Sequence, residues 1–447
     1  MDTTTCSRSD LFRSRHLLRR WGSALWLVPL MLGVGATTPV QAASASGGSW
    51  ASAGQLSVPR SETSVTLLSD GKVLVAGGAN PPEASAEVFD PATKRWSPTG
   101  ALGTARAAHA AVRLADGKVL VSGGRVGPDA LNSTEIYDPT ARTWAATGAM
   151  AFARQAHTAT LLADGKVLVA GGLGGGHGPY RVETEVFDPA TGTWSATGAL
   201  PQGRARHSAT PLNDGRVLVI GGEGAPHDDS LRDAALYDPA SRAWSPLPRL
   251  LGVGRADHTA TALPNGTVMV VGGTKVHTGG RPQNIVSTAE ILDQAGQAFL
   301  PGPAMAQRRS FHAATALAGG RVLVTGGNGD RIATPTATAE IYDPATRQWA
   351  TVSPMPDPAA SHTAVVLAGR GCGSACGQVL VVAERAAYLF TPPPPGSPGS
   401  KGANRNLLLG AVGAGAAVAA AGLIVARRRH ISPTTSRRGT DQTMEHR

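Results

Sequence analysis

The chain has 447 residues, of which 42% are hydrophobic, and a formal net charge of +10. The basic excess lies at the two ends: residues 1–43 carry five Arg against two Asp, and residues 401–447 carry eight Lys or Arg against two acidic residues. These ends account for +3 and +6 of the total, which leaves only +1 for the stretch between them. Composition therefore gives no case for nucleic-acid binding, and we expect no nucleic-acid partner.

The first 43 residues have the pattern of a secretory signal peptide. Five Arg residues form a basic segment, residues 23–35 form an apolar segment, and residues 40–42 (VQA) resemble a small-residue cleavage site. We predict a signal peptide over residues 1–43, an exported protein, and a mature chain that starts near Ala43. Retention of this segment as an uncleaved anchor is the alternative.

Between the ends, a set of landmarks recurs with a period of about 50 residues. A typical repeat has a His-led run of small residues, an Asp-Gly turn, an apolar run, a glycine pair, a variable loop, and an aromatic-Asp-Pro turn that leads to Trp. The glycine pairs are at residues 77–78, 123–124, 171–172, 221–222, 272–273 and 326–327. The Trp residues are Trp96, Trp144, Trp194, Trp244 and Trp349. Short β-branched runs between turn residues predict four antiparallel strands per repeat.

This pattern resembles the kelch repeat, which has a period of about 50 residues and forms the four-stranded blades of a β-propeller. The resemblance extends from residue 50 to about residue 391 and implies an all-β fold whose core lies between stacked blades. Repeat five departs from the pattern, because Leu292-Asp293-Gln294 replaces the Asp-Pro turn and Phe299 stands in place of Trp. We expect the outer strands of that repeat to be the least regular.

Fragments at the two ends of the repeat region complement each other. Trp50 lies ten residues before Arg60, the same interval that separates Trp96 from Arg106. Near the other end, residues 362–390 supply three further strands with no Trp after them. We therefore predict a monomeric, seven-bladed kelch β-propeller over residues 44–391, whose last blade is closed by an N-terminal strand that begins at Trp50.

Cys372 and Cys376 lie in the turn between two strands of this closing blade. In an exported protein, two Cys residues that flank a tight loop favour a disulfide. The alternative is a zinc pair, but two thiols without a second pair or a nearby His make a poor zinc site. We predict a disulfide between Cys372 and Cys376, and no metal or other cofactor.

The C-terminal segment has the pattern of a stalk and a membrane anchor. Residues 392–406 are rich in Pro and Gly and predict a semi-rigid linker. Residues 407–426 form an uncharged run that is long enough to span a hydrocarbon core of about 30 Å as a transmembrane helix. Three Arg residues follow directly, so residues 427–447 are predicted to form a basic cytoplasmic tail, with the propeller at the cell surface or in the periplasm. The ending also resembles the sorting tails of bacterial surface proteins, although no LPxTG-type motif precedes it.

Two polar residue types, His and Arg, recur at the start of the first strand in most repeats. They are His109, His157, His207, His258, His312 and His362, with Arg106, Arg154, Arg204, Arg255 and Arg309 three residues before the first five. A ring of His near an axis could bind a metal. We favour the other interpretation, in which a residue repeated in every blade serves every blade by bonding to neighbouring loops or backbone.

The enzyme class that the pattern resembles is the galactose-oxidase-like copper radical oxidases, whose catalytic domain is also a seven-bladed kelch propeller. The resemblance implies a copper site of two Tyr and two His, with one Tyr crosslinked to Cys. Here Tyr137, Tyr237 and Tyr342 occupy the aromatic slot of the repeat, and each Cys lies in the signal peptide or the predicted disulfide. The C-terminal domain that supplies a ligand in that family has no counterpart before the linker. No paired carboxylates or nucleophile constellation stands out, and no catalytic residue is predicted.

Variable loops on a rigid repeat are where propellers usually place their specificity. The loops after the glycine pairs of repeats three, four and five are long, and they share one rim with the His-led strand starts. Their polar residues suit hydrogen bonds to sugars or polar protein surfaces. They are His177, Tyr180, Arg181, His227, Asp228, Asp229, Arg232, His277, Arg281, Gln283 and Asn284.

We predict from these features an extracytoplasmic, membrane-anchored kelch propeller that acts as a binding or scaffold module for a protein or carbohydrate ligand. The alternative is a surface carbohydrate-active enzyme, either an oxidase of galactose-oxidase type or a lyase or epimerase.

Overall fold

The computed structural model describes residues 47–79, 81–176, 178–224, 229–275, 284–330 and 333–394. The chain divides into two compact units, Met1–Ser44 and Ala45–Arg447, and every described residue belongs to the second. The predicted signal peptide, transmembrane helix and cytoplasmic tail lie outside the described residues, as does the linker beyond residue 394. Within the described ranges, no helix is long and apolar enough to span a membrane.

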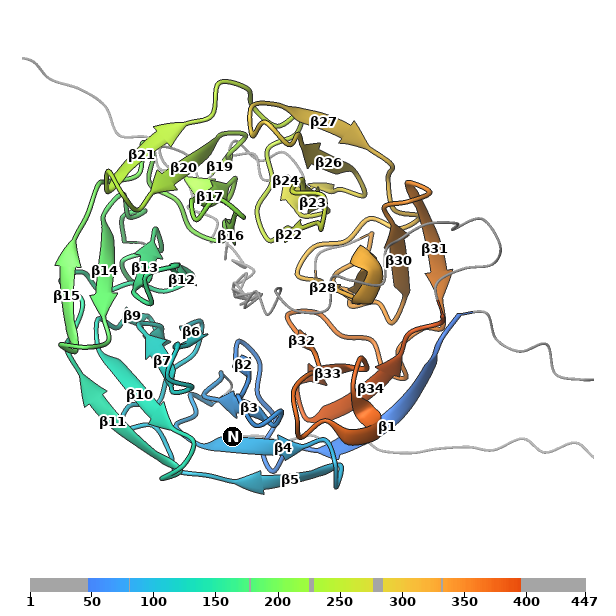
Figure 1. Cartoon of the computed structure of the whole chain (residues 1–447), viewed down its shortest axis with the longest axis horizontal. Coiled ribbons are helices and arrows are strands. Elements are labelled where there is room, and N and C mark those ends of the chain that lie inside the picture. The colour runs from blue at the N-terminus through green and yellow to red at the C-terminus, as the bar shows by residue number, and fades with distance from the viewer. Residues whose placement is uncertain are drawn as a thin grey trace, which may run out of the picture. The chain divides into compact units, whose positions relative to one another are not determined.

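The described residues form a seven-bladed β-propeller, seen along its axis in Figure 1. Each blade is an antiparallel sheet of four strands, and its innermost strand contacts those of both adjacent blades. In blade order, the innermost strands are β2 (Ser64–Leu67), β6 (Ala110–Arg113), β12 (Thr158–Leu161), β16 (Ser208–Pro211), β22 (Thr259–Ala262), β28 (Ala313–Ala316) and β32 (Thr363–Val366). The contact between β2 and β32 completes the ring, and the predicted seven-bladed fold is confirmed.

The second strand of every blade is buried along its whole length, because adjacent blades cover both of its faces. These strands are β3 (Val73–Ala76), β7 (Val119–Ser122), β13 (Val167–Ala170), β17 (Val217–Ile220), β23 (Val268–Val271), β29 (Val322–Thr325) and β33 (Val379–Ala383). Their β-branched sequences suit a strand with two covered faces.

The third and fourth strands form the outer half of each blade. The third strands are β4 (Ala86–Asp90), β10 (Thr134–Asp138), β14 (Thr184–Asp188), β20 (Ala234–Asp238), β26 (Ala289–Leu292), β30 (Ala339–Asp343) and β34 (Ala386–Thr391). The outermost strands are β5 (Arg95–Pro98), β11 (Thr143–Thr147), β15 (Thr193–Ala196), β21 (Ala243–Pro246), β27 (Phe299–Gly302), β31 (Gln348–Val352) and, in blade seven, β1 (Ser49–Gln55).

Loops at the two ends of the blades carry short elements. After the glycine pairs of blades two, four and five, three hairpins form: β8 (Arg125–Val126) with β9 (Asp129–Ala130), β18 (Glu223–Gly224) with β19 (Asp229–Ser230), and β24 (Thr274–Lys275) with β25 (Asn284–Ile285). The 3-10 turns η1 (Ala318–Gly320) and η2 (Gly373–Ala375) lie at the opposite ends of the blades, between the first and second strands of blades six and seven.

The core lies between the faces of adjacent blades. In one buried cluster, Leu74 and Val88 of blade one pack with Val121 and Tyr137 of blade two. In five blades the aromatic residue of the Asp-Pro turn pairs with the Trp of the same blade, with ring centroids 5.0–5.3 Å apart. Burial of apolar surface stabilises a fold by about 25 cal/mol per Å². Because this surface lies between blades, each blade depends on its neighbours for most of its core.

The glycine pair allows adjacent blades to approach closely. Gly77 has φ +67°, and a Cβ at this position would lie 2.5 Å from the carbonyl oxygen of Arg106 in the next blade. The N–H of Gly78 donates to that same oxygen at 2.9 Å. A side chain would therefore break the junction between blades, which explains why the pair recurs.

The predicted closure of the ring by the N-terminal strand is confirmed. β1 pairs with β34, with Trp50 opposite Phe390, and the centroids of these two rings lie 4.7 Å apart. Trp50 Nε1 also donates a hydrogen bond of 2.7 Å to the carbonyl oxygen of Ser353, at the end of blade six. Blade seven therefore needs both ends of the repeat region.

Blade five keeps its outer strands in spite of its departure from the repeat. β26 and β27 pair over four residues, with Leu292 opposite Phe299. An aliphatic–aromatic pair thus replaces the aromatic–Trp pair of the other blades, and the sheet still has four strands.

Candidate functional site

The repeated His residues connect adjacent blades. Their Nε2 atoms lie 2.8–3.0 Å from Ser or Thr hydroxyls of the preceding blade, in the pairs His109–Ser64, His157–Ser122, His207–Thr158, His258–Ser208, His312–Thr259 and His362–Thr325. Burial lowers the pKa of all six, to about 3 for His109 and His258 and to about 4 for His362, so the rings are neutral at pH 7. Across the described ranges, no three His, Cys, Asp or Glu residues are grouped to hold a metal. These contacts support the structural interpretation of the His ring.

The repeated Arg residues are buried in ion pairs. Six of these side chains, with Arg60 of blade one included, are at most 1% exposed. Five have Glu partners on the third strands, at 2.5–2.9 Å, in the pairs Arg60–Glu87, Arg106–Glu135, Arg154–Glu185, Arg255–Glu290 and Arg309–Glu340. The sixth, Arg204, makes a shorter pair with Asp233, directly before β20. The guanidinium also donates to the carbonyl oxygen of the first glycine of the pair, as Arg154 does to Gly171 at 2.7 Å. Each Arg therefore ties a loop to its own blade.

Blades four and seven lack the usual Glu. Both carry Pro at the position whose backbone N–H donates to this Glu in the other blades. In the other five blades, the Glu carboxylate also accepts the backbone N–H three residues before the buried Arg, at 2.6–3.0 Å. Blade four has Ala235 in place of Glu and Pro201 at the donor position. Blade seven has Tyr388, whose hydroxyl bonds Asp357, and Pro356 at the donor position. Because Pro has no N–H, its presence removes the donor that would otherwise be left without an acceptor.

Seven residues with left-handed backbone conformation form a ring around the axis, at the ends of the inner strands next to the glycine pairs. Each lies one position before the repeated His, or before Thr63 in blade one, and has φ between 52° and 57°. This axial ring consists of Glu62, Ala108, Ala156, Arg206, Asp257, Phe311 and Ser361. Six hydrogen bonds of 2.8–3.2 Å join it, each from an N–H to the carbonyl oxygen of the preceding member. The conformation costs a non-glycine residue about 1–2 kcal/mol, and residues held in this way cluster at functional sites.

Charged residues of the axial ring and of the adjacent loops form one group, the axial cluster: Glu62, Arg125, Arg206, Glu223 and Asp257. Arg125 donates to both carboxylate oxygens of Glu62, at 2.8 and 2.9 Å, and Arg206 donates to Glu223 at 2.9 Å. Burial raises the pKa of Glu62, although Arg125 opposes this shift, and burial raises the pKa of Asp257 well above its usual value. Burial alone would lower the pKa of Arg206, but Asp257 and Glu223 raise it overall. Coupled, partly desolvated charges of this kind are suited to bind a polar ligand.

Two of the three predicted rim residues in the long loop of blade three are described, Tyr180 and Arg181. Tyr180 is half-buried and is close enough to Arg206 to act on its pKa, so it borders the axial cluster. Arg181 instead lies over the ring of Phe152, with its guanidinium carbon 5.3 Å from the ring centroid. The structure thus brings Tyr180, but not Arg181, into the neighbourhood of the axial cluster.

The other predicted rim residues are only partly described. Arg232 is exposed and donates to the carbonyl oxygen of Leu251 at 2.7 Å, and Asn284 is exposed in β25. Asp229 lies in β19, where the backbone is described. The predicted residues that lie outside the described residues are His177, His227, Asp228, His277, Arg281 and Gln283. Their place in the binding rim stays a prediction.

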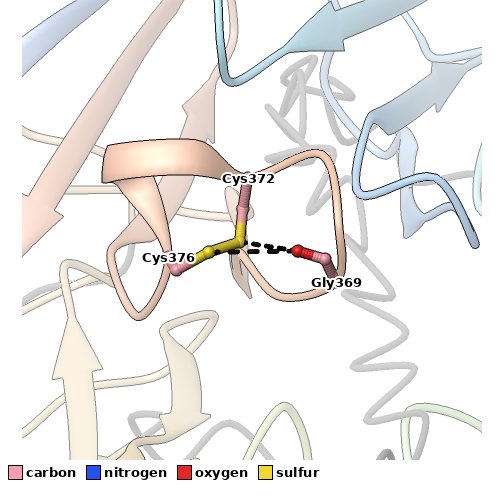
Figure 2. Close-up of a disulfide and its surroundings, with 3 residues drawn as sticks. All are labelled: Gly369, Cys372 and Cys376. Atoms are coloured by element: carbon pink, nitrogen blue, oxygen red, sulfur yellow. Dashed lines mark hydrogen bonds between the residues drawn. A yellow bond between two sulfur atoms is a disulfide. The ribbon is translucent and has the colours of Figure 1, made fainter.

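The predicted disulfide joins Cys372 to Cys376, at the ends of the inner strands opposite the axial ring (Figure 2). The two Cα atoms are 5.0 Å apart, within the usual range for a disulfide. In Figure 2, the carbonyl oxygen of Gly369 lies 2.9 Å from Sγ of Cys372. The loop packs against the first turn of blade one, because a Cβ on Gly371 would lie only 2.0 Å from the carbonyl oxygen of Asp70. The bridge shapes the junction between blades seven and one, and these two Cys residues leave no thiol for zinc.

A small pocket of about 210 Å³ lies beside this disulfide loop, lined by Leu67, Leu68, Ser69, Arg113, Ala368 and Gly369. Arg113 donates to the carbonyl oxygen of Leu67 at 3.0 Å. None of the predicted site residues lines this pocket, and the axial cluster lies at the other ends of the inner strands.

Seven four-stranded blades, joined by repeated His contacts and each braced by a buried Arg or, in blade seven, by the Tyr388–Asp357 hydrogen bond, define a β-propeller of the kelch type. A family model described as the KLHDC2/KLHL20/DRC7 Kelch-repeats domain matches residues 62–273 and 156–372. The chain belongs to the kelch-repeat family. Among curated proteins, none matches the chain.

Solved structures that share this fold include the two that follow. One is a fungal alcohol oxidase of the AA5 family in complex with copper, with 21% identity, a TM-score of 0.64, and coverage of 77% of this chain and 76% of that chain. The other is YjhT, with 16% identity, a TM-score of 0.54, and coverage of 67% of this chain and 99% of that chain. At these identities the similarity concerns the fold alone.

The copper site implied by the galactose-oxidase resemblance does not fit the residues that the structure describes. Tyr137 and Tyr237 bond the hydroxyls of Thr99 and Thr197 at 2.6 and 2.7 Å, beside the outer strands. The six repeated His residues occupy separate junctions between blades. The Cys residues of the disulfide loop are bonded to each other, so neither can be crosslinked to Tyr. No step of copper chemistry follows from this donor set.

Proposed function

We propose that the protein is a binding or scaffold module, a kelch propeller that holds a protein or carbohydrate ligand at the face of the axial ring. The axial cluster is the observation that carries this proposal. The residues that repeat in the blades have structural roles: the His side chains join adjacent blades, and the Arg side chains tie loops to their own blades. The axial ring has the same backbone conformation in all seven blades but a different side chain in most of them. Chemical variation on a fixed backbone is expected of a recognition surface.

Anchoring outside the cytoplasm is part of the same proposal. The signal-like pattern of residues 1–43 and the uncharged run 407–426 support export and a C-terminal membrane helix. The disulfide supports an oxidising compartment. Protease added outside intact cells or spheroplasts should digest the propeller and leave a membrane-bound fragment that contains the basic tail. Protection of the propeller until the membrane is lysed would contradict this arrangement.

Ligand capture tests the binding proposal directly. The full chain in mild detergent is applied to a glycan array and used in pull-downs, together with the variants Arg125→Gln and Arg206→Gln at the axial face. A matched control is Arg113→Gln, which removes a half-buried guanidinium at the opposite ends of the inner strands. We expect both axial variants to lose ligand and the control to retain it. Equal binding by all variants, or loss only in the control, would contradict the proposed face.

An oxidase remains the second candidate, because the fold resembles that of a copper-containing alcohol oxidase with a TM-score of 0.64. Copper content and hydrogen peroxide production from sugars separate the two classes. The binding proposal predicts no peroxide above the level of a heat-denatured sample, with or without added copper. Copper-dependent, saturable peroxide production would favour the oxidase.

A further inference from the structure

Asp257 differs from the other charged members of the axial cluster in its hydrogen bonding. Its backbone is fixed in the axial ring, because its N–H donates to Arg206 at 3.2 Å and its carbonyl oxygen accepts from Phe311 at 3.1 Å. Its Oδ1 is shielded from solvent and has no hydrogen-bond partner. A shielded carboxyl oxygen without a donor is unfavourable, so the site is incomplete as it stands.

The charges around Asp257 show which partner it lacks. Arg125 is paired with Glu62, and Arg206 donates to Glu223, so Arg206 is shared between Glu223 and Asp257. Among the described residues, the cluster has three carboxyls and two guanidiniums, one negative charge in excess when all are ionised. Burial raises the pKa of Asp257, Arg206 opposes that shift and Glu223 adds to it. On the other side of Asp257 the ring continues with the uncharged Phe311. A cation at this position would balance the charges of the group and complete the pairing of Asp257.

We propose that the axial site takes a basic side chain, Lys or Arg, of a protein ligand, with Asp257 as its carboxylate partner. This inference rests on the proposed binding function and chooses protein over carbohydrate. Oδ1 of Asp257 lies below the solvent-exposed surface, so the cation must arrive at the end of a stem. The alkyl stems of Lys and Arg provide this reach, whereas an amine attached directly to a sugar ring does not.

Short peptides test the chemistry in the full, exported chain. The probes are the capped tripeptides Ac-Ala-Arg-Ala-NH₂ and Ac-Ala-Lys-Ala-NH₂. Their controls are the same peptide with citrulline, the neutral isostere of Arg, and free glucosamine. Titration calorimetry at pH 7 should show saturable binding of a basic tripeptide and at least about ten-fold weaker binding of the citrulline peptide and of glucosamine. The proposal would be overturned if neither basic tripeptide binds, or if the citrulline peptide binds as tightly as they do. Binding of glucosamine that is tighter than that of the basic tripeptides would also overturn it and would point to an amino sugar instead.

Asp257→Asn is the matching variant, because it keeps the shape of the side chain and removes the charge. It should weaken the basic tripeptide by about ten-fold or more. The control Asp116→Asn, in an exposed turn at the other ends of the inner strands, should leave binding unchanged. Undiminished binding by Asp257→Asn contradicts the assignment of this residue.

Proton release gives a second readout that needs no variant. Burial keeps the Asp257 carboxyl protonated to higher pH in the free protein, and a bound cation favours its ionised form. Binding should therefore release protons, which calorimetry detects as a difference in binding heat between buffers of unlike ionisation enthalpy. The affinity should also rise with pH until Asp257 of the free protein is itself ionised. Binding without proton release up to that pH would contradict the role of Asp257. A protein or glycan captured by the full chain but unaffected by Asp257→Asn would overturn this inference alone and leave the proposed function standing.

Discussion

Removal of the Glu340 carboxylate should show how much the Arg–Glu ion pair, which is repeated in most of the blades, contributes to the free energy of unfolding. Arg309 is 0% exposed and donates to Glu340 at 2.6 Å, and the same carboxylate accepts the N–H groups of Ala306 at 2.8 Å and Gln307 at 3.3 Å. Glu340→Ala leaves a buried guanidinium and two N–H groups without their acceptor. Loss of one partner of a buried ion pair costs about 3–5 kcal/mol, and we expect a loss of this size in the free energy of unfolding.

Blade four provides the design of a rescue variant. It carries Asp233 and Pro201 at the positions that correspond to Thr338 and Ala306, and Ala at the position of Glu340. The triple variant Ala306→Pro, Thr338→Asp, Glu340→Ala copies this arrangement and should recover at least half of the loss. Urea unfolding of the full chain, followed by Trp fluorescence, gives the free energy of unfolding of the unchanged protein, of Glu340→Ala and of the triple variant.

An exposed ion pair of the same blade serves as the control. Arg308 and Asp330 lie 3.3 Å apart with side chains that are 53% and 89% exposed, so Asp330→Ala should change stability little. A loss below about 1 kcal/mol in Glu340→Ala would refute the reasoning, since it would lie in the range of exposed pairs. Absence of any recovery in the triple variant would refute the proposed link between Pro and the missing Glu.

Three further predictions concern the ring. Deletion of residues 44–56 removes β1 and the Trp50 contacts, so it should cost several kcal/mol and expose the edge of β34 to aggregation; an unchanged melting temperature would speak against closure. Because burial lowers the pKa of the six repeated His residues below 6.5, unfolding takes up protons, and stability should fall as the pH falls below 6.5 towards about 4; a flat pH profile of unfolding free energy would be inconsistent with buried neutral rings. Cys372 and Cys376 should resist alkylation until a reductant is added, with little change in stability on reduction because the loop is short; two thiols that react without reductant would exclude the bridge.

The fold could be predicted because its landmarks repeat. The glycine pair, the Asp-Pro turn and the Trp each serve one function in every blade, so their spacing reveals the number of blades. Closure could be predicted as well, since Trp50 keeps the interval to Arg60 that the other blades show. Departures were tolerated where packing could compensate, as in the pairing of Leu292 with Phe299.

The axial cluster was missed for the opposite reason. Three of its residues, Glu62, Arg206 and Asp257, belong to the axial ring, whose side chains differ from blade to blade, so no motif draws attention to them. Arg125 and Glu62 are 63 positions apart in sequence, and only the ring brings them together. The register was nevertheless available: the residue before each His gives six members of the axial ring, and the residue before Thr63 of blade one gives the seventh. The Pro at two donor positions was likewise visible, but its meaning depends on knowing where the neighbouring carboxylate lies.

Hydrogen exchange of the captured complex tests the central claim, that the ligand binds at the axial ring, most directly. Amide exchange is compared in the full chain with and without the protein ligand isolated in the pull-down. The account predicts slower exchange in segments 204–207 and 255–258, which contain Arg206 and Asp257, and no change in the Asp-Gly turns at the other ends of the inner strands, such as residues 69–72 and 164–166. Protection of those turns, with the axial segments unchanged, would contradict it.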